Sequence, residues 1–266
     1  MSPHVRPPAV AGAFYPGSGA TLLGEVDALL AGAEANGSTA KAFIVPHAGY
    51  VYSGPIAASV YAQLARRAPK PTRVVLLGPS HHVGFLGLAL PGCEFFDTPL
   101  GRVPLDVDSM KQLSRFEQVR VLPRAHAKEH SLEVQLPFLQ RALGDFTLVP
   151  LVVGDASPAE VAEVLEVLWG GPETVVLVSS DLSHFLPSAE ARVLDGETAR
   201  RIVALDAAPL EGEEACGCRP VNGLLEVARR KRLVASALDV RNSGDTAGDR
   251  SRVVGYGAFA FTETAS

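Results

Sequence analysis

Short apolar segments alternate with amphipathic segments along this chain. The pattern predicts an α/β fold, with a central, mostly buried β-sheet flanked by helices on both faces. Four segments are almost continuously apolar, as strands buried on both faces should be: residues 42–45, 74–77, 145–153 and 174–178. We find no internal repeat, low-complexity tract or linker, so we expect residues 1–266 to form a single domain.

The segments between the first strands repeat apolar residues at helical spacing. The first helix should bury one face made of Leu22, Leu23, Val26, Leu29 and Leu30. Pro55 suits the first position of a helix and is expected to open the second, with a buried stripe of Ile56, Val60 and Leu64. Residues 105–116 should form a third helix, and 87–90, 94–98 and 119–122 should be extended.

The second half of the chain continues the alternation. Pro137 interrupts the helical pattern from Leu132 to Leu143, which predicts a kink or a late helix start. Ser157-Pro-Ala-Glu160 has the form of a capping box and should begin the next helix. A long helix is expected at 188–205, a short one around 224–227, and final strands at 233–240 and 252–261.

Charge and cysteine content exclude several classes of protein. The net charge is −5, and the longest basic run, residues 229–232, should form the last turn of a helix, so we expect no nucleic-acid binding. The N-terminus lacks the apolar core of a signal peptide, and no apolar stretch could span a bilayer. Three cysteines are too few for a disulfide framework. We therefore expect a reduced, cytoplasmic protein with no membrane partner.

Three of the four buried strands are followed directly by residues that bind metals or transfer protons. His47 follows the first strand, His81 and His82 follow the second, and Asp181 and His184 follow the last. Ligands of open α/β sheets bind at the carboxyl ends of the strands, so these side chains should converge if the strands are neighbours. Two histidines and a carboxylate favour non-haem Fe(II), although the same set could hold Zn(II).

Further residues could contribute to this site. Cys216 is a soft ligand at an expected helix N-terminus, which would lower the pKa of its thiol. Glu129 and His130 could supply a base or a group that orients a metal ligand. Because adjacent residues of an extended chain point apart, at most one of His81 and His82 should face the metal.

Each candidate also has an ordinary alternative. Cys216 could be a small buried apolar residue, and Asp181 could only cap a helix. His4 and His126 have no comparable context and are expected to be solvated. Cys218 receives no role.

Five motifs occur in order: Pro46-His-Ala-Gly-Tyr-Val-Tyr-Ser-Gly54, Leu77-Gly-Pro-Ser-His-His82, Glu129-His-Ser-Leu-Glu-Val-Gln-Leu-Pro137, Ser179-Ser-Asp-Leu-Ser-His184 and Cys216-Gly. Together with Ala11-Gly-Ala-Phe-Tyr15 and Val254-Gly-Tyr-Gly-Ala258, they resemble the Memo family. Its bacterial and archaeal members are called protein B of the AmmeMemoRadiSam system. The resemblance covers nearly the whole chain.

The resemblance implies a fold like that of the class III extradiol ring-cleaving dioxygenases, which are non-haem iron enzymes. It also implies that His47, His81 and Cys216 are metal ligands. By the same resemblance, Asp181 and His184 line the pocket, with His184 matching the dioxygenases' catalytic histidine, and His130 is a further pocket residue. Cys216 stands where the dioxygenases carry a glutamate ligand. A thiolate there would alter the iron's potential and favour copper, because soft ligands select Cu(I).

Two functions are consistent with these residues. The first is a redox enzyme that uses Fe(II) or copper on an unknown small substrate, with His184 oriented by Asp181 as general acid or base. Zn(II) is a further metal that the same ligands could hold. The second is a non-enzymatic carrier of copper or iron that uses the same ligands. The family association also suggests protein partners in a radical-SAM-associated modification pathway.

Overall fold

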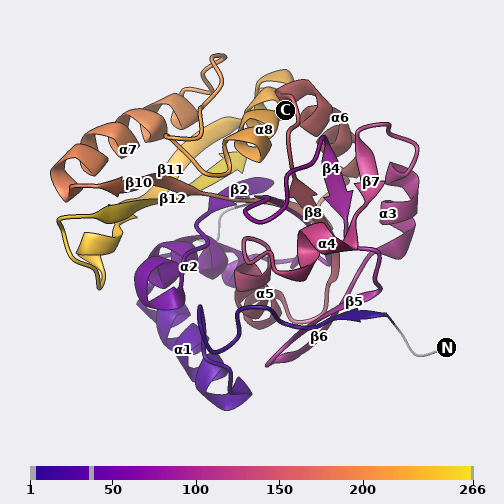
Figure 1. The fold of residues 1–266 in the computed structure, drawn as a ribbon, viewed down its shortest axis with the longest axis horizontal. Coiled ribbons are helices and arrows are strands. Elements are labelled where there is room, and N and C mark those ends of the chain that lie inside the picture. Colours follow the sequence, from indigo (N-terminus) through magenta and orange to yellow (C-terminus); the bar gives the residue numbers. More distant parts are fainter. Residues whose placement is uncertain (1–3, 36–38, 265–266) are drawn as a thin grey trace.

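The computed structural model describes residues 4–35 and 39–264. Within them, nine strands form one sheet in the order β10-β12-β2-β9-β3-β8-β4-β7, with β11 paired to β12, and β1, β5 and β6 form a small second sheet (Figure 1). The strands are β1 Val5–Arg6, β2 Ala42–Val45, β3 Arg73–Pro79, β4 Leu88–Leu90, β5 Phe95–Thr98, β6 Gly101–Pro104, β7 Val119–Val121, β8 Thr147–Val153, β9 Thr174–Ser179, β10 Asp181–Leu186, β11 Val234–Asn242 and β12 Val253–Thr262.

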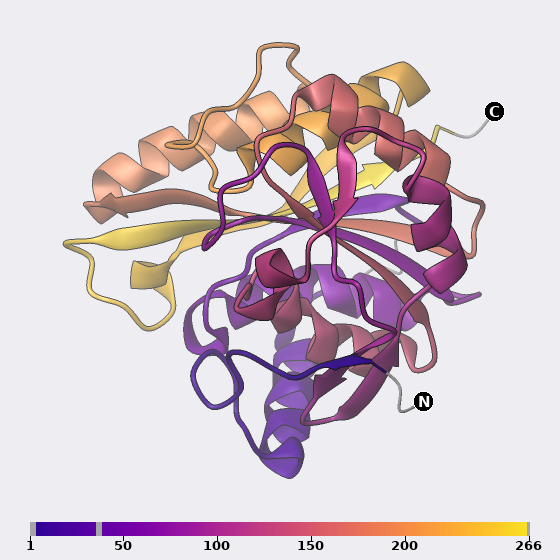
Figure 2. The same ribbon diagram turned by 45° about the vertical axis from the view of Figure 1, so that its right-hand side comes forward.

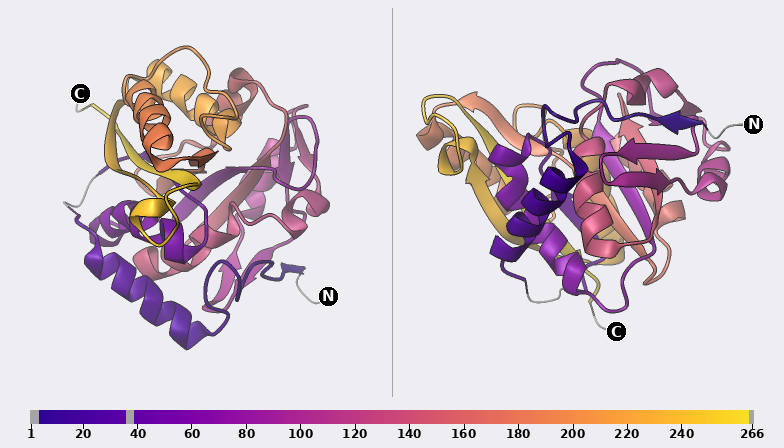
Figure 3. Two further views of the ribbon diagram at one scale, coloured as in Figure 1. Left: turned by 60° about the vertical axis from the view of Figure 1, so that its left-hand side comes forward. Right: turned by 90° about the horizontal axis from the view of Figure 1, so that it is seen from below.

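Helices cover both faces of the large sheet. They are α1 Gly19–Gly32, α2 Tyr50–Arg66, α3 Val107–Leu113, α4 Pro123–Ala127, α5 Leu136–Leu143, α6 Pro158–Leu168, α7 Ser188–Val203 and α8 Cys218–Lys231, with 3-10 turns η1 Glu133–Gln135 and η2 Ser243–Asp245. Helices α1, α2 and α5 pack together below the sheet and α6, α7 and α8 lie above it (Figure 2), and the views in Figure 3 agree. The predicted α/β fold class is confirmed. Among the described residues, no helix is long and apolar enough to cross a membrane.

Four parallel strands form the centre of the large sheet. Strand β2 pairs with β9, β9 with β3, and β3 with β8. Every residue of β2 and β9 is buried, which explains why their sequences are continuously apolar. The register places Val45 beside Ser179, so β2 and β9 end together, and β3 ends next to them. The residues that follow these three strands therefore meet at one edge of the sheet.

Two helix predictions are confirmed in detail. The segment before Pro137 forms the 3-10 turn η1, and α5 begins only at Leu136, which is the predicted late start. Ser157 and Glu160 form both hydrogen bonds of a capping box at the start of α6.

One other local prediction is wrong, and one of the alternatives left open by the sequence is excluded. Helix α2 begins at Tyr50, so Pro55 lies inside it and does not open it. This costs little because the carbonyl that Pro55 leaves without an N–H partner is that of Val51, in the first helical turn, and Val51 is exposed. Asp181 does not cap a helix: residues 181–186 form β10, which pairs with β12, and α7 begins at Ser188.

The N-terminal arm is held by one buried carboxylate. Glu133 is fully buried and forms an ion pair with Arg6, with 2.7 Å between Oε2 and Nη1. The same carboxylate accepts hydrogen bonds from the backbone N–H groups of Ala9 and Val10 and from the hydroxyl of Tyr15. Arg6 also donates to the carbonyl of Glu129. The arm is thus bound to the segment that leads into α5.

We predict that Glu133→Ala destabilises the protein by about 3–5 kcal/mol, because it leaves the Arg6 guanidinium buried without its counter-charge. Chemical denaturation of the purified variant measures the change in the free energy of unfolding. Glu163→Ala, which removes an exposed carboxylate, is the control and should change stability by less than about 0.5 kcal/mol. A similar small change for Glu133→Ala would show that the buried ion pair contributes little.

Candidate metal centre

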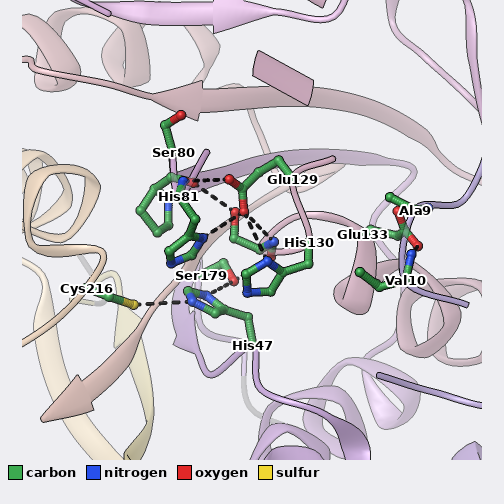
Figure 4. A network of polar contacts seen from close by, with 12 residues as sticks. Ala9, Val10, His47, Ser80, His81, Glu129, His130, Glu133, Ser179 and Cys216 are labelled. Carbon is green, nitrogen blue, oxygen red and sulfur yellow. Dashed lines mark hydrogen bonds and ion pairs between the residues drawn. The ribbon is translucent and has the colours of Figure 1, made fainter. Parts of the chain in front are cut away.

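Three side chains from separate parts of the chain point toward one another at the carboxyl edge of the sheet (Figure 4). The ligand atoms of His47, His81 and Cys216 all lie within 4.8 Å of one another. Cys216 Sγ is 3.2 Å from His47 Nε2, and the ring centroids of His47 and His81 are 5.1 Å apart. The structure therefore brings together the three residues that the sequence resemblance implied as metal ligands.

His47 is fixed at both its backbone and its ring. Its backbone N–H donates to Asp181 Oδ1 over 2.7 Å, and its ring Nδ1 lies 2.9 Å from Ser179 Oγ. Burial lowers the pKa of His47 well below its usual value, and the neighbouring His81 and His130 lower it further. The imidazole is therefore neutral at physiological pH, which leaves a ring nitrogen free to bind a metal.

His81 is held by a single buried carboxylate. Glu129 Oε2 accepts the backbone N–H of His81 over 2.7 Å, and Glu129 Oε1 lies 2.8 Å from His81 Nδ1. Burial alone would raise the pKa of Glu129, but the hydrogen bonds and charge of His81, together with the N–H of Ser131, outweigh it and hold this pKa well below the usual range. Glu129 is thus an ionised group that orients a candidate ligand, as predicted.

Cys216 reaches the site because the next residue is a glycine. A Cβ at Gly217 would lie 2.7 Å from the Cβ of Ser180 and 2.8 Å from the carbonyl oxygen of Ser179, so a larger residue would force the loop away. The Gly217 N–H donates to Ser180 Oγ, and the Cys216 N–H to the Asp181 carbonyl. These bonds tie the loop to the end of β9.

The predicted effect of a helix N-terminus on Cys216 is wrong. Helix α8 begins two residues later, at Cys218, and burial raises the pKa of the Cys216 thiol, with a further rise from the nearby Asp181. In the absence of a metal, Cys216 is therefore a thiol whose S–H can donate to the lone pair of His47 Nε2.

The three residues predicted to be catalytic occupy different positions. Asp181 does not orient His184: its carboxylate accepts the His47 N–H, and burial raises its pKa to about 7. His184 Nδ1 instead lies 2.9 Å from the carbonyl oxygen of Leu182. His130 stacks on His81 with 4.6 Å between ring centroids, and burial lowers its pKa to about 4.

Two other histidine predictions are tested by burial. His81 and His82 are both exposed, but only His81 belongs to the group with His47 and Cys216, so only one of the two adjacent histidines faces the cluster. His126 was expected to be solvated, and this is wrong. It is buried, with Nε2 2.8 Å from the Ala89 carbonyl oxygen, because helix α4, which the sequence did not reveal, packs it against the sheet.

A cavity of about 250 Å³ adjoins the cluster. Cys216 forms part of its wall, and so do the ends of β3 and β8 and the start of α8. Cys218, which had no assigned role, lines the same cavity, as does Arg219, whose guanidinium pairs with Asp155 over 2.7 Å. The volume is slightly below the roughly 300–1,000 Å³ typical of ligand pockets, so it suits a small molecule.

Sequence reasoning missed two residues that support the cluster, one in contact with His47 and one behind it. Ser179 lies beside the His47 ring, and Gln135 donates to Ser179 Oγ over 2.8 Å. Both are fully buried polar residues beside apolar neighbours. The sequence shows that these polar residues stand next to apolar ones, but it does not reveal the hydrogen-bond partner of Ser179 or of Gln135.

The fold and the site together define a class: α/β proteins with two imidazoles and a thiol gathered at the carboxyl edge of a parallel sheet. The family model described as "Memo-like protein" matches residues 6–260. The chain belongs to this family, and the resemblance drawn from its motifs is confirmed.

Relatives with the same family name align along almost the whole chain. The "MEMO1 family protein" of Metallosphaera sedula is 38% identical over 97% of this chain and 99% of its own length. That of Aquifex aeolicus is 36% identical over 95% and 97%, respectively. A crystal structure of the uncharacterized protein JW3007 from Escherichia coli K12 has a TM-score of 0.51 at 14% identity and covers 82% of this chain and 98% of its own. It shows a shared fold.

We predict that Cys216 of the metal-free protein reacts with iodoacetamide at least about tenfold more slowly at pH 7.5 than a free cysteine, because its raised pKa leaves little thiolate. The rate should climb steadily with pH through pH 9. Mass spectrometry of the labelled peptides measures it, and the urea-unfolded protein is the control. Fast labelling of Cys216 at pH 7 would restore the original expectation of a lowered pKa.

Proposed function

We propose that this chain is a metal-dependent redox enzyme that holds one Fe(II) ion through His47, His81 and Cys216 and acts on a small substrate in the adjoining cavity. The observation that carries the proposal is the convergence of three ligand atoms within 4.8 Å of one another. Three separate segments supply them, and each segment is fixed by buried or partly buried hydrogen bonds that would be costly to assemble for packing alone.

The donor set fits a transition metal. Imidazole and thiolate ligands suit iron, zinc and copper, whereas magnesium and calcium require oxygen ligands. Three protein ligands also leave coordination positions for a substrate, as in catalytic sites. Iron in such a site would supply one-electron chemistry toward dioxygen. Zn(II) and Cu(I) remain alternatives that the same ligands could bind.

The other residues would orient ligands and transfer protons. Burial lowers the pKa of His184, so its imidazole is neutral, and its Nδ1 is occupied by the Leu182 carbonyl. Its Nε2 would then take a proton from a substrate that extends from the cavity toward the metal, because His184 itself does not line the cavity. Asp181 would act through His47, whose backbone it holds. His130 does not line the cavity and would instead hold the His81 ring in place by stacking on it.

The runner-up function is a copper carrier, and one observation favours it. Cys216 and Cys218 line the same cavity, and paired soft sulfur ligands select Cu(I). In that case the cavity would be the route of the metal and would hold no substrate. Partnership with proteins of a radical-SAM-associated pathway stays a prediction under either function.

We predict that metal binding releases about one proton, because His47 is already neutral and the Cys216 thiol must ionise. Below the thiol's pKa, affinity should therefore rise about tenfold per pH unit. Anaerobic calorimetry with Fe(II) in buffers of different ionisation enthalpy measures both effects. Cys216→Ala should bind much more weakly without this proton release, while Cys218→Ala should match the wild type. Equal binding by wild type and Cys216→Ala would overturn the ligand assignment.

We predict that Val83→Trp abolishes turnover but keeps the metal, because Val83 lines the cavity and is not a ligand. The iron-loaded wild type should consume oxygen with at least one member of a panel of phenols and catechols, and the variant should be at least about tenfold slower. Metal content of both proteins is the control. No oxygen uptake by the wild type across the panel, together with tight Cu(I) binding that Cys216→Ala and Cys218→Ala each weaken, would favour the carrier.

A further inference from the structure

We infer that Ser179 and Gln135 are positioning residues that fix the imidazole of His47 in one tautomer, with the proton on Nδ1. Nε2 then always carries the lone pair that faces Cys216. The inference deepens the proposed function, since Nε2 is the atom that would bind the metal. The tautomer itself, however, is a property of the metal-free protein and can be measured without any ion.

The direction of each hydrogen bond follows from groups that can only accept. The carbonyl of Pro46 lies 2.9 Å from the side-chain amide of Gln135, so the amide nitrogen must be on that side. The amide oxygen then faces Tyr61, whose hydroxyl donates to it over 2.7 Å. The second hydrogen of the amide nitrogen points to Ser179 Oγ, 2.8 Å away.

The hydrogen bonds that Ser179 forms with its other neighbours leave it able only to accept from His47. Its hydroxyl must donate to the carbonyl of Ser131, 2.6 Å away, because a carbonyl cannot donate. One of its two lone pairs accepts from Gln135. The other faces His47 Nδ1 at 2.9 Å, and Ser179 has no hydrogen left to give. His47 must therefore be the donor, with its proton on Nδ1 and the lone pair on Nε2.

Burial makes this arrangement stable. Tyr61 and Ser179 are 0% exposed, Gln135 is 1% exposed and His47 is 2% exposed. Solvent therefore cannot take over a bond that a reversal would break. The opposite tautomer would require the Ser179 hydroxyl to turn toward His47 and leave the Ser131 carbonyl without this partner, which is costly in a buried site.

His81 and His184 carry the same tautomer by different means. The carboxylate of Glu129 can only accept from His81 Nδ1, and the Leu182 carbonyl can only accept from His184 Nδ1. All three histidines thus present Nε2. Only His47 depends on a serine, which can donate or accept, so only His47 needs further groups to set the direction: the Ser131 carbonyl takes the hydroxyl's hydrogen, and Gln135 occupies one of its lone pairs.

The test compares Ser179→Ala with Ser53→Ala. Ser53 has an equally buried hydroxyl that donates to the carbonyl of Ala48, next to His47, but it is outside the network. Long-range ¹H–¹⁵N correlation spectra of the metal-free proteins report the tautomer of His47. Wild type and Ser53→Ala should show only the Nδ1–H form, and Ser179→Ala should show a measurable share of the Nε2–H form.

Affinity for Co(II), used as a spectroscopic probe, gives the second readout. Ser179→Ala should bind about 10–100-fold more weakly, and Ser53→Ala within about twofold of wild type. Gln135→Met keeps the side-chain volume but removes one hydrogen-bond donor to Ser179, so its Co(II) affinity should lie between those of the two serine variants. This variant replaces Ser179→Ala in the test if Ser179→Ala does not fold. A pure Nδ1–H form in both network variants, or unchanged Co(II) affinity, would overturn the inference. If the wild type itself binds no Co(II) or Fe(II), the proposed function fails, while the tautomer spectra still decide the role of Ser179.

Discussion

The buried carboxyl edge of the sheet depends on hydrogen bonds supplied by residues 129–135. In this segment every second residue serves a different part of the molecule. Glu129 holds His81, the carbonyl of Ser131 receives the Ser179 hydroxyl, Glu133 binds the N-terminal arm, and Gln135 donates to Ser179 beside His47. A buried polar group without a partner is costly, so the loss of any one of these contacts would leave its buried partner unsatisfied. The segment is thus the common support of the fold and the site.

The sequence predicted the sheet well because burial on both faces leaves a direct trace in composition. The apolar segments 42–45 and 74–77 became parts of β2 and β3, and His47 and His81, just after these strands, are two of the three members of the cluster. The predicted start of the second helix is wrong because contacts with distant parts of the chain, and not the local sequence, decide where that helix begins. Pro55 lies inside α2, which begins at Tyr50 directly after the His47 loop.

The chemistry of the site was harder to predict than its location. The pKa of Cys216 depends on where α8 begins and on how deeply the loop is buried against Ser180, and neither appears in the local sequence. The partner of Asp181 was also missed, because the His47 backbone lies 134 residues away in the chain. Several partners of equivalent chemistry are available to each such residue, and contacts between distant parts of the chain decide which one it bonds to. Residue type and spacing can therefore identify the members of a site, but they do not assign the hydrogen bonds between them.

The ionised state of Glu129 has a consequence for the charge of an occupied site. Its carboxylate stays negative in the interior, and a Cys216 thiolate would add a second negative charge beside it. A divalent ion bound there would balance these two charges, and a trivalent ion would also balance Asp181 when that carboxyl, with its pKa of about 7, is ionised. A monovalent ion would leave a net negative charge, and uncompensated charge is expensive away from water. Charge balance therefore favours a metal ion with at least two positive charges in this site, independently of the softness of its ligands.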